Sequence, residues 1–280
     1  SFLYFTYLLH PQSLFAQGSV DGDFFKEEFS FSNQRIIPCA TPDPTIDQII
    51  ESKAEVDEWL MQNGNRNRNQ VVVYVIWHVI YASDGTGNIS DNRIIAQIEA
   101  MNQEFQNNNS NIFFSLDSIN RVENNEWFTG WAYFGDALDD VGMEELHYDP
   151  AHYLNIYSAQ LYDSGAGSLV TLGYTAFPTN LAETSYMQGF TLDHRAVAGG
   201  LYGSQSAVHE AGHYLGLYHT FQTNCLAPDD AVDDTPRNDE NFLQTCNIQD
   251  TCPNDPGNDP VENHMNCLLY TSDAADETVS

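Results

Sequence analysis

One eleven-residue segment holds the residues best suited to chemistry. It reads His209-Glu210-Ala211-Gly212-His213-Tyr214-Leu215-Gly216-Leu217-Tyr218-His219. On a helix, His209 and His213 lie one turn apart on one face, so both imidazoles can bind a single metal ion, with Glu210 beside them. Gly216 can take the left-handed conformation that ends a helix, and the chain can then turn back to present His219. Three imidazoles leave the fourth tetrahedral position open to water, a layout typical of zinc hydrolases.

An ordinary amphipathic helix with buried, hydrogen-bonded histidines is the alternative interpretation of this segment. Five fixed positions within eleven residues favour the metal site over that alternative. The expected chemistry is hydrolysis. Zinc lowers the pKa of a bound water, and Glu210 takes the proton and returns it to the leaving group.

The elements that must position this segment are visible in the hydrophobic pattern. Residues 71–81 form a continuous β-branched run, as expected of a central buried strand. Apolar residues at three- and four-residue steps predict helices over about 46–60 and 94–105. Further strands are expected at 112–116, 153–157 and near 171–176. From Thr223 onward the chain is rich in Asp, Asn, Pro and Cys and should be irregular.

The composition excludes some functions. The chain has 280 residues, with 9 Lys and Arg against 40 Asp and Glu, giving a formal charge of −31. Such a field repels phosphate backbones, so nucleic-acid binding is not expected. No segment is long and apolar enough to predict a membrane span. The sequence carries no signal for the oligomeric state.

The beginning of the chain predicts export and processing. Residues 1–17 resemble the apolar core and cleavage region of a signal peptide, which predicts a secreted, extracellular protein. Residues 18–68 are polar, contain Pro38, Pro42 and Pro44, and end in an Asn/Arg-rich run that indicates a linker. We therefore expect a signal-peptide remnant at 1–17, a pro-segment at 18–68 and a catalytic domain at 69–266.

Three motifs together resemble one known family. They are the segment from His209 to Phe221, then Asp233-Asp234-Thr235-Pro236, then Glu262-Asn263-His264-Met265. This set resembles the pappalysin (cytophagalysin-like) branch of the metzincin metalloproteases, over roughly residues 71–265. The resemblance implies a two-lobed α+β catalytic domain with a twisted mixed β-sheet, a zinc-binding helix and an irregular C-terminal lobe. It also implies a secreted zinc endopeptidase that acts on protein or peptide substrates.

The resemblance assigns a role to individual residues. His209, His213 and His219 correspond to the zinc ligands, and Glu210 corresponds to the general base. Met265 corresponds to the Met-turn residue that lies beneath the zinc; outside this context it would be read as an ordinary core methionine.

The end of the chain departs from the family pattern. Cys267 stands where the family usually has a tyrosine that helps to hold the substrate, and residues 267–280 do not resemble the family's continuation. We treat 267–280 as an anomalous C-terminal tail and expect the lost hydroxyl to lower activity without preventing zinc binding.

Five cysteines in an exported protein predict disulfides and one odd thiol. By resemblance, Cys225 pairs with Cys252, and Cys246 is left to pair with Cys267. Cys39 lies alone in the pro-segment, in a stretch that resembles the family's latency segment. A thiolate is a good fourth zinc ligand, so we expect Cys39 to block the centre in a latent zymogen. An inert thiol is the alternative.

The acidic run after the zinc segment predicts a second metal ion. The residues concerned are Asp229, Asp230, Asp233, Asp234 and Thr235. Carboxylates on an irregular chain suit Ca²⁺, and the family resemblance supports a structural ion here. A solvated acidic turn is the alternative. For the whole chain, the alternative to a zinc endopeptidase is a non-catalytic, calcium-stabilised binding or adhesion module on the same fold.

Overall fold

A computed structural model describes residues 35–37, 39–64, 69–131, 137–161, 169–239, 249–255 and 257–266. The predicted leader at 1–17, residues 65–68 of the linker predicted at 63–69, and the anomalous tail at 267–280 lie outside these residues. The proposed domain boundaries therefore stay predictions. None of the helices in the described ranges is long and apolar enough to cross a membrane.

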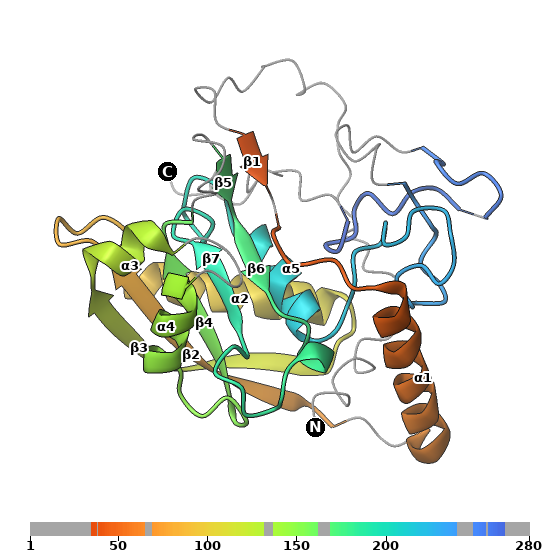
Figure 1. The fold of residues 1–280 in the computed structure, drawn as a ribbon, viewed down its shortest axis with the longest axis horizontal. Helices are drawn as coiled ribbons and strands as arrows, with labels where there is room; N and C mark the ends of the chain where they lie inside the picture. Colours follow the sequence, from red (N-terminus) through yellow and green to blue (C-terminus); the bar gives the residue numbers. More distant parts are fainter. Residues whose placement is uncertain are drawn as a thin grey trace.

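A five-stranded sheet forms the centre of the fold (Figure 1). Its strands, in spatial order, are β3 (Ile112–Glu123), β2 (Val71–Tyr81), β4 (Tyr153–Ala159), β7 (Phe190–Asp193) and β6 (Gly173–Thr175). Neighbouring strands are parallel except β6 and β7, which are antiparallel. A separate parallel pair joins β1 (Arg35–Ile37) to β5 (Leu169–Thr171). The mixed sheet expected from the sequence is confirmed.

Helices cover both faces of the sheet. On one face, α2 (Asp91–Asn107) and α5 (Gln205–Tyr214) pack against the side of β2 that carries Val75 and Trp77. On the other, α3 (Asn125–Gly130) and α4 (Ala137–Leu146) cover Ile80 and Tyr157. A short 3₁₀ helix spans Pro178–Asn180. Because β2 is buried on both sides, its sequence is continuously apolar rather than alternating.

Helix α1 (Ile46–Asn63) lies in the predicted pro-segment, beyond α5 and away from the sheet (Figure 1). It begins with a capping box: the Thr45 side chain accepts from the Gln48 backbone N–H, and the Gln48 side chain accepts from the Thr45 backbone N–H. Ile49 and Val56 are buried, so one face of the helix is packed against the rest of the chain.

Several elements differ from the sequence-based expectation. The strand expected near 171–176 is two short strands, β5 and β6, because the chain leaves its pairing with β1 and joins β7. Strand β3 extends to Glu123, well beyond the expected end at 116. Strand β7 and helices α3 and α4 are short and were not predicted.

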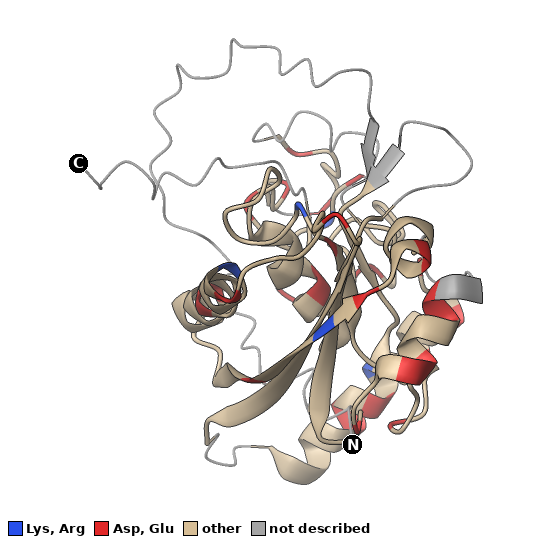
Figure 2. Cartoon of the chain, turned by 90° about the vertical axis from the view of Figure 1, so that its left-hand side faces the viewer, with Lys and Arg blue, Asp and Glu red and all other residues tan. Residues whose placement is uncertain are grey.

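Acidic residues occur on helices and loops around the molecule, whereas Lys and Arg are few (Figure 2). The excess of acidic residues agrees with the formal charge of −31. The acidic residues are not confined to one segment of the chain.

The side chain of Asn102 forms hydrogen bonds with the backbone of β3, an edge strand of the sheet. Its side-chain amide donates to the Phe114 carbonyl oxygen at 2.8 Å and accepts from the Phe114 N–H at 2.7 Å. Asn102→Ala leaves both backbone groups unpaired in a buried region, so we expect the free energy of unfolding to fall by roughly 2–3 kcal/mol. Thermal or denaturant unfolding measures this. Gln103→Ala, at an exposed position of the same helix, is the matched control; an equal effect in both variants would contradict the role of Asn102.

Candidate metal centre

The three histidines of the sequence motif are delivered by one helix and the turn after it. His209 and His213 lie one turn apart on α5, which ends at Tyr214. Gly216 has a φ of 93°, in the left-handed region that favours glycine, and its N–H donates to the His213 carbonyl oxygen at 2.8 Å. This turn reverses the chain and places His219 beside the two helical histidines.

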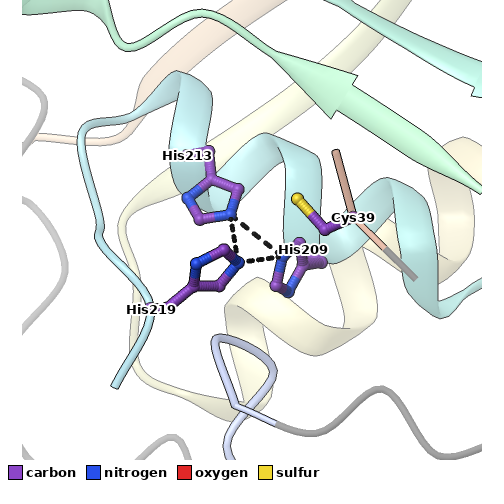
Figure 3. Close-up of side chains that lie close together, drawn as sticks. All are labelled: Cys39, His209, His213 and His219. Atoms are coloured by element: carbon purple, nitrogen blue, oxygen red, sulfur yellow. Dashed lines mark hydrogen bonds between the residues drawn. The ribbon is translucent and has the colours of Figure 1, made fainter. Parts of the chain in front are cut away.

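The three rings converge on one point (Figure 3). The Nε2 atoms of His209 and His213 are 2.9 Å apart, and His219 Nε2 lies 3.2 Å from the first and 3.1 Å from the second. All three side chains are buried. Zinc bonds of 2.0–2.1 Å in tetrahedral geometry place ligand nitrogens about 3.3 Å apart, so the spacing fits a zinc ion.

Hydrogen bonds on the far sides of the rings fix their protonation. His209 Nδ1 donates to the His264 carbonyl oxygen at 2.6 Å, and His213 Nδ1 donates to the Leu217 carbonyl oxygen at 2.7 Å. Because a carbonyl oxygen only accepts, each Nδ1 carries the hydrogen and each Nε2 presents a lone pair. Burial lowers the pKa of His209 to about 4 and also lowers the pKa of both other rings. His209 and His213 thus present neutral Nε2 lone pairs to the point where the three rings meet, as ligands of a metal cation do.

Cys39 completes the group. Its Sγ and the nitrogens of the three histidines all lie within 4.8 Å of one another, and Figure 3 shows the thiol beside the rings. In the described part of the chain, no other group of three or more His, Cys, Asp or Glu side chains is placed to hold an ion. Burial, followed by the neighbouring Glu210 carboxyl, raises the pKa of the Cys39 thiol.

Glu210 is fully buried on the same helix. Its Oε2 accepts a hydrogen bond of 3.1 Å from Thr41 Oγ1. Burial raises the pKa of Glu210 to about 8, while Cys39 and Thr41 act in the opposite direction. A Cβ at Gly173 would lie 2.8 Å from Glu210 Cγ, so glycine at this position lets β6 approach the carboxyl group directly.

Residues 39–41 lie along β6, the edge strand of the sheet. The Ala40 N–H donates to the Gly173 carbonyl oxygen at 3.0 Å, and the Thr175 N–H donates to Thr41 Oγ1 at 3.0 Å. Just before them, β1 pairs in parallel with β5. The predicted pro-segment therefore occupies the sheet edge next to the histidines.

Met265 lies beneath α5. Its Sδ would be 2.4 Å from a Cβ at Gly212, so glycine again permits close packing. The Met265 carbonyl oxygen accepts from the Thr220 N–H at 3.0 Å, and the Met265 N–H donates to Asn263 Oδ1 at 2.8 Å. The turn is thereby joined to the segment that carries His219.

The acidic residues predicted to bind calcium do not converge in this structure. Asp229 pairs with Arg237 at 2.9 Å, and the exposed Asp233 pairs with Lys53 at 2.9 Å. Asp230 is buried, and this burial, together with Asp229, raises its pKa from 3.8 to about 7 against the hydrogen bonds of Val232 and Thr235. Burial also raises the pKa of Asp234.

Cys225 and Cys252 form a disulfide with a Cα–Cα distance of 5.4 Å, which is the pairing implied by the family resemblance. Cys246 and Cys267 lie outside the described residues, so the second expected pair stays a prediction.

Sequence reasoning gave no role to several residues around the centre. Thr41 contacts Glu210, Asp43 lies 3.9 Å from His219 Nδ1, and Phe177 packs edge-on against the His213 ring. Thr41 and Asp43 are close to Cys39 in sequence, which was the available signal. Nothing in the sequence pairs Phe177 with His213.

Known proteins similar to this chain were found by sequence. A family model described as pregnancy-associated plasma protein-A matches residues 137–277. An extracellular metalloprotease of Verticillium alfalfae is 31% identical over 257 residues, covering 87% of this chain and 84% of that protein. An extracellular metalloprotease of Arthroderma otae is 36% identical over 196 residues, covering 67% of each.

A solved structure supports the fold. A mutant of Tannerella forsythia promirolysin superposes with a TM-score of 0.56 and 22% sequence identity, covering 71% of this chain and 76% of that chain. This similarity concerns the architecture.

Proposed function

The chain belongs to the pappalysin family of metallopeptidases, and from that premise we propose that it is a secreted zinc endopeptidase made in a latent form. The observation that carries this proposal is the convergence of three neutral imidazole nitrogens next to a buried carboxyl group on the same helix. His209, His213 and His219 would hold the zinc ion.

The proposed reaction is hydrolysis of a peptide bond in a protein or peptide substrate. Bound zinc would supply a Lewis acid that polarises a carbonyl group and makes water more acidic. Glu210 is the base that takes the proton from water and returns it to the leaving amine. A base works best when its pKa lies near the working pH, and the burial of Glu210 moves its pKa in that direction.

A non-catalytic module on this fold is the weaker proposal. A binding module needs no carboxyl group buried beside a metal centre, and burial of such a group costs free energy. Glu210 is fully buried there. A function in proton transfer accounts for the burial of the Glu210 carboxyl group beside the histidines, whereas a binding function does not.

We attribute latency to residues 39–41. Cys39 Sγ and the three histidine nitrogens lie within 4.8 Å of one another, so the thiolate would take the fourth position and exclude the water needed for hydrolysis. Thr41 holds the carboxyl group of Glu210 at the same time. The metal and the base would therefore both be occupied in the precursor.

Helix α1 supports the same latent arrangement. Its Ile49 packs with Phe177 and Tyr218 in one buried cluster, and Phe177 contacts the His213 ring. Lys53 of α1 adds an ion pair to Asp233. Removal of the pro-segment would thus open a surface next to the centre.

Secretion and a structural calcium ion complete the proposal. The Cys225–Cys252 disulfide suits an oxidising compartment, and relatives are named extracellular metalloproteases. We place calcium at the segment 229–235, because the buried Asp230 carboxyl lacks a strong countercharge and an ion would supply one. Asp229, Asp233, Asp234 and Thr235 are the neighbouring oxygen donors in that proposal.

Glu210→Gln tests the base. The variant keeps the shape of the side chain and the three histidines, so we expect about one zinc per chain. Casein cleavage by the processed protein should fall about 10²–10⁴-fold. Metal analysis measures the zinc content, and chelator-sensitive proteolysis by the same sample measures the cleavage of casein. Wild type that holds zinc but shows no cleavage after removal of residues up to about 65 would support the binding-module alternative.

Cys39→Ser tests latency. The hydroxyl group is a much weaker zinc ligand than a thiolate, so the unprocessed variant should cleave casein while unprocessed wild type does not. Its activity should stay below that of the processed protein, because Thr41 still contacts Glu210. Mass spectrometry must show that the chain is intact. Thr41→Val is the matched control: it frees Glu210 but leaves the thiol at the metal, and it should stay latent. Equal latency of the Cys39→Ser variant and wild type would contradict the proposal.

Asp230→Asn tests the calcium segment. The folded-state pKa of about 7 lies above the ordinary value of 3.8, so stability is lost as the pH rises through 7. Between pH 5 and pH 8 in calcium-free buffer, the free energy of unfolding should fall by roughly 2–3 kcal/mol more in wild type than in the variant. Added Ca²⁺ should remove most of that difference. Unfolding curves with the same pH dependence in both proteins, and no effect of Ca²⁺ on wild type, would exclude this site.

A further inference from the structure

His264 makes two contacts at opposite ends of the residue. Its backbone carbonyl oxygen accepts the Nδ1 hydrogen of His209 at 2.6 Å. Its ring Nε2 lies 3.4 Å from Glu104 Oε2, on α2. Glu104 is therefore joined to the metal centre through a single intervening residue, although 105 positions separate it from His209 in the sequence.

The Glu104–His264 contact is shielded from solvent. The side chain of Glu104 is 22% exposed and that of His264 is 15% exposed. A hydrogen bond to a carboxylate in such surroundings is screened less than one on the surface. His264 also lowers the pKa of Glu104, so this carboxyl group is ionised at neutral pH.

Apolar packing leaves this turn incompletely supported. A cavity of about 20 Å³ lies between α2, α5 and the turn, and Glu104, Val208, Gly212, His264 and Met265 are among its lining residues. Side chains leave this space beside the His264 ring unfilled, and Glu104 is the polar partner of the ring among the described residues. The carbonyl oxygen that orients His209 belongs to the same residue.

We propose that Glu104 is a positioning residue of the metal centre: it holds His264, and His264 fixes the ring plane and tautomer of His209. This inference rests on the proposed zinc site. It assigns Glu104 no contact with substrate and no part in proton transfer.

Zinc affinity tests the proposal without reference to proteolysis. Loss of an outer partner of a metal ligand typically weakens metal binding 10–100-fold, and we expect about a tenfold increase in the zinc dissociation constant for Glu104→Ala. Glu99→Ala, at an exposed position of α2, is the matched control and should bind zinc like wild type. Glu104→Gln keeps the size of the side chain and serves if Glu104→Ala does not fold.

Cobalt substitution and a double-variant cycle separate positioning from general stability. The visible absorption of Co²⁺ reports ligand geometry, so Glu104→Ala should change the spectrum of the Co²⁺-loaded protein, and Glu99→Ala should not. Glu104→Ala combined with His264→Ala should bind zinc no more weakly than His264→Ala alone, because both act through one contact.

Unchanged zinc affinity and an unchanged spectrum in Glu104→Ala would overturn the inference while leaving the proposed protease intact. Wild type that binds no zinc would overturn both. Additive losses of zinc affinity in the double variant would also contradict the proposal, since they would show that Glu104 does not act through His264.

Discussion

The structure depends on the convergence of three buried imidazole rings: the Nε2 atoms of His209, His213 and His219 face one point inside the protein. The Nδ1 hydrogen bonds to the carbonyl oxygens of His264 and Leu217 fix the orientation of two rings, and burial keeps all three neutral. A cation between the nitrogens would bind the lone pairs that His209 and His213 present. The fold around α5 therefore holds a ligand geometry suited to a metal ion before any ion binds.

Three glycines allow the fold to bring other elements to this point. Gly216 reverses the chain after α5, Gly212 admits the Met265 sulfur, and Gly173 admits the Glu210 side chain. Each is needed for a different reason, namely a left-handed φ in the first case and close contact in the other two. A methyl group at Gly212 or Gly173 would push the turn or the edge strand away from the helix.

The sequence predicted what local pattern can encode. Strand 71–81 was found because a continuous β-branched run has few alternative structures, and the histidine spacing follows from helical geometry. Pairings between distant segments were not accessible. Nothing in the sequence joins Glu104 to His264, and the carboxylates of 229–235 were grouped by proximity in the chain although Arg237 and Lys53 take two of them. The short elements β7, α3 and α4 carry too few residues for a periodic signal.

The segment 39–43 compensates groups that are costly to bury. Within five residues, Cys39 lies beside the histidines, Thr41 donates to Glu210, and Asp43 approaches His219. These contacts stabilise the closed centre because a buried polar group without a partner costs free energy. Water could replace all three partners in a chain without this segment, since the same groups would then be uncovered. The centre is thus polar enough to favour either the segment or solvent, and the additional burial supplied by α1 at Ile49 favours the segment.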